Sequence, residues 1–396
     1  MATTVKKHQQ LSKEIIKHLY YNKMLTLTEL SALSNKSLPM VTAIVNDLID
    51  EGYVSESGLA PSTGGRRAST FLLNPAKRRF VVAVAMDQLV TQVVIYDLLN
   101  KEQGPVQTLS LKLPEEGEAF DKLVGFINHN ISNSGISKEN LLGVGIGMPG
   151  FINTRKGVNH SFFNLNDGST LTDSLSKALD LPVFIDNDSS LIAQAELKFG
   201  VGKGHKDVMV VNFGWGVGLG MIINGKLFRG HSGYAGEFSH IPLSNTNKLC
   251  SCGKRGCLEV ETSLLVLVER ARAEMEMGAT SRMESLFADT TKLAGEHLLT
   301  AAKNGDPLAV SILSDAAFLI GKGLSTLIHI LNPELIILGG RGAMAGKILM
   351  APVQQAINEF CIPRLAEHTT IVISEIGHTS ELLGAATLVI ENCEFN

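Results

Sequence analysis

The sequence predicts an α/β protein in which a small helical module precedes a larger body of two lobes. Three observations predict it: apolar residues recur at helical spacing over 11–49, short β-branched runs alternate with helical patterns after residue 80, and 396 residues suit two or three domains. The predicted parts are a module at 1–74, a linker at 75–79, a first lobe at 80–185 joined by a C-terminal helix at 380–396, and a second lobe at 186–379.

Composition and charge narrow the classes of protein. No uninterrupted apolar run approaches the ~20 residues that span a bilayer, and the N-terminus carries lysines where a signal peptide would be apolar. We therefore expect a cytoplasmic protein without a membrane partner. Residues 1–79 hold 11 Lys/Arg against 6 Asp/Glu, whereas the rest holds 24 against 33. This split favours nucleic-acid contact at one end, although a solvated surface can carry a similar excess.

The N-terminal module has the pattern of three helices and a wing. Apolar stripes predict helices over 11–25 and 28–33, and a third helix that begins near Ser37 and ends at Gly52. Two short strands, 53–55 and 70–73, flank a turn-rich segment. This order is typical of a winged helix-turn-helix. A three-helix dimerisation module would share the periodicity, but the wing favours DNA binding.

The third helix and the wing supply the candidate DNA contacts. Ser37 suits the N-cap, Pro39 the first turn, and several side chains point away from the apolar stripe. In the wing, two glycines precede two arginines, which suit the narrow minor groove of A·T-rich DNA. The candidates are Ser37, Pro39, Met40, Thr42, Asn46, Arg66 and Arg67.

The body contains two successive runs of strands and helices. The first run has strands at 81–85, 93–96, 107–113 and 142–146, with a helix over 120–132. The second has strands at 208–213, 218–223 and 226–228, followed by helices at 261–280, 293–304 and 307–331. Two mixed sheets, each closed by helices, predict two lobes with a cleft between them.

Three of the five cysteines lie within eight residues, and a histidine precedes them. Three thiolates and an imidazole complete a tetrahedral zinc set, and Gly253 and Gly256 allow the loop to fold tightly. Cysteines can also cluster by accident in a loop. Because protein atoms fill all four positions, we expect structural zinc. Its ligands are His240, Cys250, Cys252 and Cys257.

Further motifs make the whole chain similar to the ROK family of repressors and sugar kinases, in particular its N-acetylglucosamine- and xylose-type regulators. The resemblance implies an actin-like, sugar-kinase-like (ASKHA) body. It rests on the cysteine segment and on Gly64-Gly65-Arg66-Arg67, Gly147-Met148-Pro149-Gly150, Asp186-Asn187-Asp188, Gly214–Gly220, Gly236–His240, Asn332-Pro333-Glu334 and Gly339-Gly340.

The family implies a sugar site. In its kinases, the aspartate that matches Asp188 is the general base, and neighbouring carboxylates, amides and an imidazole hold the sugar hydroxyls. His240 would bind zinc through one ring nitrogen and the sugar through the other. The implied sugar contacts are Asn164, Asn187, Asp188, Glu237, His240 and Glu259.

Two departures from the family weaken the expectation of phosphoryl transfer. The kinase loop Asp-x-Gly-Gly-Thr is here Asp87-Gln88-Leu89-Val90-Thr91, and Gly-Thr-Gly is Gly214-Trp215-Gly216. The first change places branched side chains where backbone amides would approach phosphates, and the second exchanges a hydroxyl for an indole. We expect no enzymatic activity and a vestigial base at Asp188.

These features predict a sugar-responsive transcriptional regulator that represses carbohydrate-utilisation genes. Its partners would be operator DNA and a sugar or sugar phosphate, and the chain would form a homodimer or a homotetramer. The alternative is an ATP-dependent sugar kinase of the glucokinase or N-acetylhexosamine kinase type, which Asp188 supports. A regulator captured by another protein is a third hypothesis.

Overall fold

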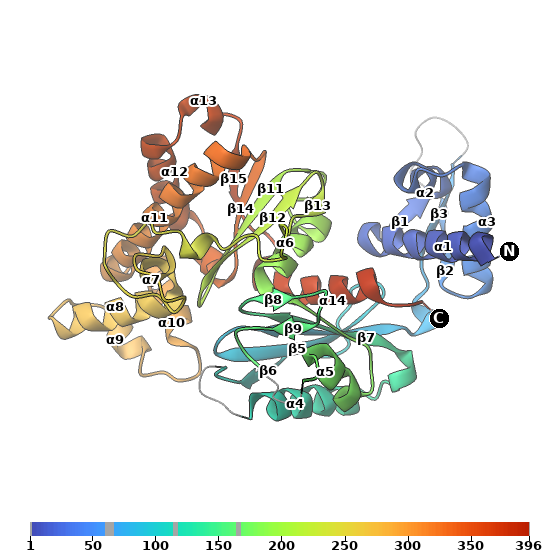
Figure 1. The fold of residues 1–396 in the computed structure, drawn as a ribbon, viewed down its shortest axis with the longest axis horizontal. Helices are drawn as coiled ribbons and strands as arrows, with labels where there is room; N and C mark the ends of the chain where they lie inside the picture. The colour runs from blue at the N-terminus through green and yellow to red at the C-terminus, as the bar shows by residue number, and fades with distance from the viewer. Residues whose placement is uncertain (1, 60–66, 114–117, 164–167, 396) are drawn as a thin grey trace. The chain divides into compact units, whose positions relative to one another are not determined.

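A computed structural model describes residues 2–59, 67–113, 118–163 and 168–395 (Figure 1). The chain forms two compact units. One comprises residues 1–186 and 385–396, and the other comprises 187–384.

The first unit begins with three helices and a three-stranded sheet in the order β1-β3-β2. The elements are α1 (Ala2–Asn22), β1 (Met24–Thr26), α2 (Leu27–Ser34), α3 (Leu38–Asp50), β2 (Val54–Leu59) and β3 (Ser69–Leu73). The apolar stripes pack inward, with Ile15 and Val45 fully buried. A capping box between Thr26 and Glu29 starts α2, and Gly52, at φ +79°, follows the end of α3. The structure thus has the helices and wing of a winged helix-turn-helix.

Several details of this module differ from the sequence prediction. The first helix is predicted over 11–25, but α1 begins at Ala2 and ends at Asn22, and β2 extends to Leu59 where the predicted strand ends at residue 55. The sheet has a third strand, β1, which pairs with β3; three residues are too few to show an alternating pattern. Ser37 does occupy the N-cap of α3 in an extended conformation, but its hydroxyl makes no capping hydrogen bond. The first helical turn of α3 therefore lacks a side-chain cap.

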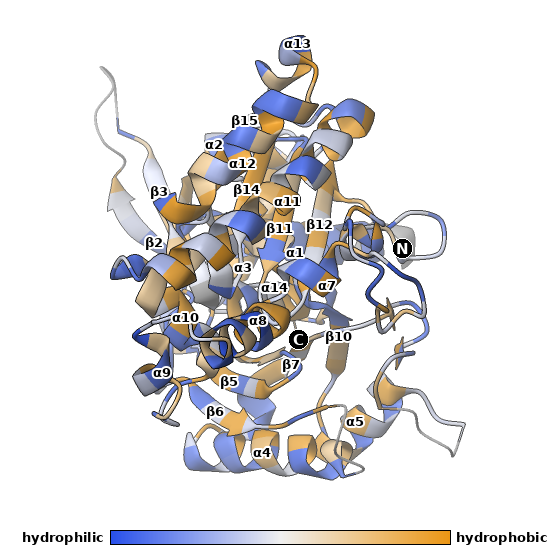
Figure 2. Cartoon of the chain, turned by 90° about the vertical axis from the view of Figure 1, so that its left-hand side faces the viewer, coloured by the Kyte–Doolittle hydropathy of each residue, from blue (hydrophilic) through white to orange (hydrophobic). Residues whose placement is uncertain are grey.

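The body of the first unit is a five-stranded mixed sheet in the order β10-β7-β4-β5-β6. The strands are β4 (Phe80–Met86), β5 (Val90–Asp97), β6 (Gln107–Ser110), β7 (Leu141–Met148) and β10 (Val183–Asn187). Helices α4 (Ala119–Asn133) and α5 (Leu171–Leu179) contribute to its hydrophobic core, and hydrophilic and hydrophobic residues recur along α4 (Figure 2). A short hairpin joins β8 (Ile152–Asn153) to β9 (Val158–Asn159).

The C-terminal helix α14 (Ser380–Asn392) ends against the first helix of the chain. Lys17 Nζ donates to the carbonyl and the carboxylate of Glu391, each at 2.9 Å, and the Tyr21 hydroxyl donates to the same carboxylate at 2.5 Å. Just beyond, Phe395 meets Tyr53 edge to face with ring centroids 6.3 Å apart. Residues at the two ends of the chain therefore pack together within the first unit.

The second unit is built on another five-stranded sheet, in the order β13-β12-β11-β14-β15. Its strands are β11 (Val208–Phe213), β12 (Val217–Ile223), β13 (Lys226–Leu227), β14 (Leu335–Gly339) and β15 (Thr370–Ile373). Its longer helices are α6 (Asp188–Phe199), α8 (Leu264–Glu276), α10 (Ala294–Lys303), α11 (Pro307–Leu331) and α12 (Lys347–Phe360). The shorter helices are α7 (Glu259–Thr262), α9 (Met283–Leu286) and α13 (Pro363–Ala366).

The predicted helix over 261–280 is divided in the structure. Ser263 adopts an extended conformation between α7 and α8, and its hydroxyl accepts from the Val266 amide as an N-cap. Serine competes with helical backbone in this way, and the apolar periodicity on either side hides the break. The division lets α7 carry Glu259 in a direction independent of α8.

Helix α11 is long and apolar enough to cross a membrane by length and composition alone. More than half of its most apolar stretch is buried inside the structure. At Gly321 its backbone approaches α12 so closely that a β-carbon would lie 2.8 Å from Ala356. The burial and close packing are those of a core helix.

Candidate functional site

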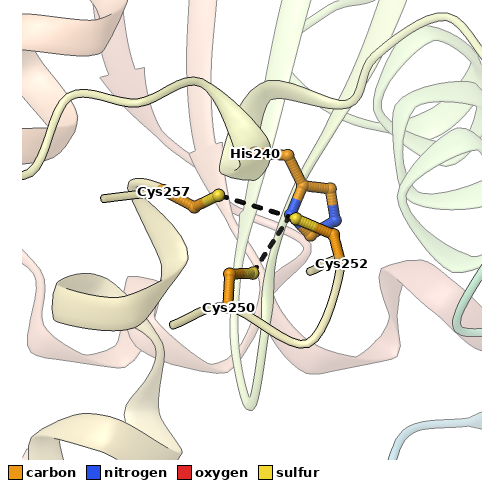
Figure 3. A group of neighbouring side chains, drawn as sticks. All are labelled: His240, Cys250, Cys252 and Cys257. Carbon is orange, nitrogen blue, oxygen red and sulfur yellow. Dashed lines mark hydrogen bonds between the residues drawn. The ribbon is translucent and has the colours of Figure 1, made fainter. Parts of the chain in front are cut away.

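A compact cluster of three thiols and one imidazole lies in the second unit. His240 ends a short 3-10 helix (Phe238–His240), Cys250 and Cys252 lie in the following loop, and Cys257 lies two residues before the start of α7. The Cys250 amide donates to Lys254 and the Gly253 amide donates back to Cys250, which closes a tight turn. Figure 3 shows the four side chains pointing toward one another.

The separations within this cluster fit a tetrahedral ion. All four candidate ligand atoms lie within 4.8 Å of one another. Tetrahedral zinc with bonds of ~2.3 Å to sulfur and ~2.05 Å to nitrogen requires S···S separations of about 3.8 Å and S···N separations of about 3.6 Å. Cys252 Sγ lies 3.7 Å from Cys257 Sγ, and Cys250 Sγ lies 3.5 Å from His240 Nδ1. The cluster can therefore hold a metal ion of the size of zinc.

The two ring nitrogens of His240 face different surroundings. Nδ1 lies toward the thiols, and the Glu259 carboxylate is 3.8 Å away from it. Nε2 lies 3.6 Å from the carboxylate of Glu237. The predicted double role of His240 requires this arrangement, because one nitrogen can face a metal while the other faces a neighbouring carboxylate.

Three carboxylates, those of Asp188, Glu237 and Glu259, lie near one another around His240. Partial burial raises the pKa of Glu237, an effect that His240 opposes and that the nearby Asp188 and Glu259 reinforce. Burial also raises the pKa of Glu259, against a hydrogen bond from the Val217 amide. Carboxylates grouped in this way accept hydrogen bonds from vicinal hydroxyls, which is the chemistry of sugar recognition.

One of the predicted sugar contacts, Asn187, directly precedes Asp188 and has a structural role of its own. The Asn187 side-chain oxygen accepts from the amides of Ser189 and Ser190 and caps α6, so this atom already has a structural role. Asn164 lies outside the described residues. A direct contact between either residue and a sugar stays a prediction.

The predicted DNA contacts lie mostly on the outward face of α3. Ser37, Pro39, Met40 and Asn46 are exposed, whereas Thr42 is half-buried and its hydroxyl donates to the Leu38 carbonyl. In the wing, Arg67 is exposed directly before β3. Arg66 lies outside the described residues. DNA contact by these residues stays a prediction, and the geometry leaves the face accessible.

The loop over 87–91, where the sequence predicts an altered phosphate loop, is closed on itself. The Asp87 carboxylate accepts from the amides of Leu89 and Val90, both at 2.8 Å. Val90 and Thr91 are buried at the start of β5. Backbone amides that would face a phosphate in a glycine-rich loop are here engaged by a carboxylate of the same loop.

The loop over 214–216, where the sequence predicts a second altered phosphate loop, carries the buried side chain of Trp215. Its indole is 4% exposed and packs so tightly on α10 that a β-carbon at Gly295 would lie 2.5 Å from the ring. The guanidinium of Arg341, which is paired with Glu296 at 2.8 Å, lies 5.8 Å from the ring centroid. Trp215 is thus an internal packing residue of the second unit.

Comparison with known proteins agrees with this architecture. The sequence pattern of the ROK family matches residues 107–392, most of the chain. The chain belongs to the ROK family. The matched segment starts within the first unit and does not include the winged helix-turn-helix of this ROK protein.

Both repressors and kinases are among the ROK relatives. A xylose repressor from Caldicellulosiruptor bescii is 28% identical over 384 residues, which cover 96% of this chain and 94% of the repressor. A glucokinase from Halalkalibacterium halodurans is 34% identical over 269 residues, which cover 66% of this chain and 80% of the kinase. The repressor match thus extends over nearly the whole chain, whereas the kinase match leaves a third of it unmatched.

A solved structure supports the fold. The crystal structure of a ROK family transcriptional regulator, described as a homologue of the E. coli MLC protein, superposes with a TM-score of 0.76 over 97% of this chain and 96% of its own, at 22% identity. The actin-like ROK body with an N-terminal winged helix is therefore the fold of this protein.

Sequence reasoning missed two residues of the site. Asn212 and Ser189 both donate to the Asp188 carboxylate. One signal could have found Asn212, because it is the only polar residue in the strand Val208–Phe213 and stands directly before the loop of Trp215. A polar side chain in a buried strand needs a partner.

Proposed function

We propose that this ROK protein is a cytoplasmic, sugar-responsive transcriptional regulator that represses genes of carbohydrate use by binding operator DNA as a homodimer or homotetramer. The observation that carries the proposal is the presence, in one chain, of a winged helix with an accessible α3 and a group of carboxylates beside His240. Similarity to a xylose repressor over nearly the whole chain supports it. The effector is a sugar or sugar phosphate.

The response needs no catalysis. A sugar that binds the carboxylate group in one conformation better than in another shifts the population of the chain toward that conformation. A coupling of 1–3 kcal/mol between the sugar and DNA sites changes operator affinity by about 5- to 150-fold. Asp188, Glu237, His240 and Glu259 would hold the hydroxyls of the effector.

The bound metal ion is proposed to be zinc with a structural role. His240, Cys250, Cys252 and Cys257 would hold it. When bound, it supplies a crosslink between the short 3-10 helix and the loop before α7. His240 Nε2 then stays oriented toward Glu237, and Glu259 stays beside the imidazole.

A titration tests the proposed function. Operator DNA is first selected from random sequences with the full chain, and its affinity is measured by fluorescence anisotropy with D-xylose, D-glucose, N-acetyl-D-glucosamine and their phosphates. We expect one compound to weaken DNA binding by about 5- to 150-fold. Glu237→Ala should abolish this response and retain DNA affinity, because it removes a hydroxyl acceptor far from α3 in the sequence.

The matched control is Glu359→Ala, which removes an exposed carboxylate from α12 of the same unit. It should respond to the effector like the wild type. Operator affinity that is unchanged by every compound in the panel would refute the sugar-responsive role.

The second candidate is an ATP-dependent sugar kinase, which the similarity to glucokinase favours. The engaged amides of Leu89 and Val90 and the packed indole of Trp215 argue against it. Kinases typically turn over at about 1–100 s⁻¹, and the loss of one hydrogen-bond donor that stabilises developing charge lowers the rate by about 10²- to 10³-fold. We therefore expect ADP release at least about 10⁴-fold below such rates.

A coupled assay for ADP with the same sugars measures this. The wild type and Asp188→Asn should give the same background rate. A robust rate that Asp188→Asn abolishes would establish a kinase and overturn the assignment as a regulator without catalysis.

A further inference from the structure

The carboxylate of Asp188 is held by protein donors on both of its oxygens. Oδ1 accepts from the Ser189 amide at 2.7 Å and from the Ser189 hydroxyl at 3.1 Å. Oδ2 accepts from Asn212 Nδ2 at 3.2 Å. The carboxylate therefore cannot rotate without breaking a hydrogen bond, and its plane is fixed by two residues.

Asn212 is itself held by the backbone around it. It is the penultimate residue of β11, where it pairs with Gly218 of β12 on one side and with Gly339 of β14 on the other. A β-carbon at Gly340 would lie 2.3 Å from Asn212 Oδ1, so the amide oxygen points at this glycine. The amide nitrogen therefore points at Asp188.

Ser189 is fixed in a similar way. A β-carbon at Gly218 would lie 2.0 Å from its hydroxyl oxygen, and that oxygen also accepts from Asn212 Nδ2 at 3.2 Å. With the amide of Asn212 turned over, a carbonyl oxygen would face the Asp188 carboxylate and leave two acceptors in contact. The network of Asp188, Ser189 and Asn212 thus has one consistent orientation.

We infer that Asn212 is a positioning residue that holds Asp188 as a fixed hydroxyl acceptor of the sugar site. Donors on both oxygens fix the plane of this carboxylate. The same arrangement suits binding, because each remaining lone pair points in a fixed direction toward a sugar hydroxyl. The inference rests on the proposed function, since it assumes that a sugar binds beside Asp188.

Exchanging the donor and the acceptor of the hydrogen bond between Asn212 and Asp188 tests this contact without a sugar. Asn212→Asp is isosteric and places an acceptor against the carboxylate, so it should lower Tm by about 2–4 °C. Adding Asp188→Asn restores a donor in the opposite direction while the oxygen that faces Ser189 is kept. The double variant should regain most of the lost Tm. If the double variant instead loses as much Tm as the two single variants lose together, the contact between Asn212 and Asp188 is refuted.

A second measurement tests the role in sugar binding. Calorimetry of the metal-loaded full chain uses D-xylose, D-glucose and N-acetyl-D-glucosamine as probes. For the probe that the wild type binds, Asn212→Asp should weaken binding more than about 10-fold, since a single unpaired buried acceptor costs about that much. Unchanged affinity in this variant would overturn the positioning role, because a residue that only fills space tolerates an isosteric change.

The control is Asn358→Asp, which adds the same charge at an exposed position on α12. It should leave Tm and sugar affinity unchanged. A wild type that binds none of the probes would count against the proposed function, while the exchange of donor and acceptor still decides whether Asn212 positions Asp188.

Discussion

Cys257→Ser is expected to abolish stoichiometric metal binding, to lower Tm by about 10 °C and to weaken sugar binding more than 10-fold. Cys257 is fully buried, and its neighbours in the core are Cys250 and Val260. Structural zinc contributes about 10 kcal/mol or more to the folding of small zinc domains. A third of that contribution corresponds to about 10 °C for a unit of this size.

The effect on sugar binding follows from the position of the cluster. His240 is a candidate ligand of the metal and lies beside Glu237, while Glu259 follows Cys257 by two residues. Loss of one ligand frees the cysteine loop and the start of α7. His240 and Glu259, two of the proposed contacts to the sugar hydroxyls, then lose their fixed positions. Metal content by mass spectrometry, thermal unfolding and calorimetry with the effector measure the three effects.

Cys361→Ser is the matched control. Cys361 is buried at the end of α12 and belongs to no cluster of candidate ligands among the described residues. This variant makes the same chemical change, and it should retain one metal ion per chain. The metal assignment fails if Cys257→Ser keeps its full metal content and the Tm of the wild type.

Local features of the fold and site were predictable from the sequence. The metal cluster was predictable because its three cysteines lie within eight residues and the histidine lies ten residues before the first of them. The helices of the N-terminal module were predictable because their apolar residues recur with the helical period, as in the buried stripe from Val41 to Leu48. In both cases the signal lies within a short stretch of chain.

Contacts between distant residues were not predictable in this way. Asn212 meets Asp188 across 24 residues, and Lys17 meets Glu391 across 374. No periodicity links such pairs, because the strand order and the path of α14 determine which side chains meet. The break at Ser263 was missed for another reason, since its capping hydrogen bond replaces helical backbone without changing the apolar pattern.

Replacing Arg66 and Arg67 together with alanine is expected to weaken operator binding by about 100-fold, since each arginine contact to DNA contributes about 1–3 kcal/mol. Arg67 is exposed beside β3, where the wing can present it to a groove. Removal of two cationic contacts should also reduce the slope of log affinity against log salt by about 0.9 for each phosphate neutralised. Anisotropy titrations at several salt concentrations measure both effects.

The slope separates a wing that contacts DNA from a wing that only supports α3. Arg155→Ala with Arg364→Ala removes the same charge from two exposed positions outside the winged helix and should leave affinity and slope unchanged. A wing variant with lower affinity but an unchanged slope would mean that the arginines act through the position of α3, because no counterions would be exchanged at the wing. Unchanged affinity would exclude the wing from the DNA interface.

For a dimer, half-sites about 34–36 Å apart place both copies of α3 on one face of the duplex. Five base pairs added between the half-sites should therefore reduce binding of the wild type to that of a single half-site.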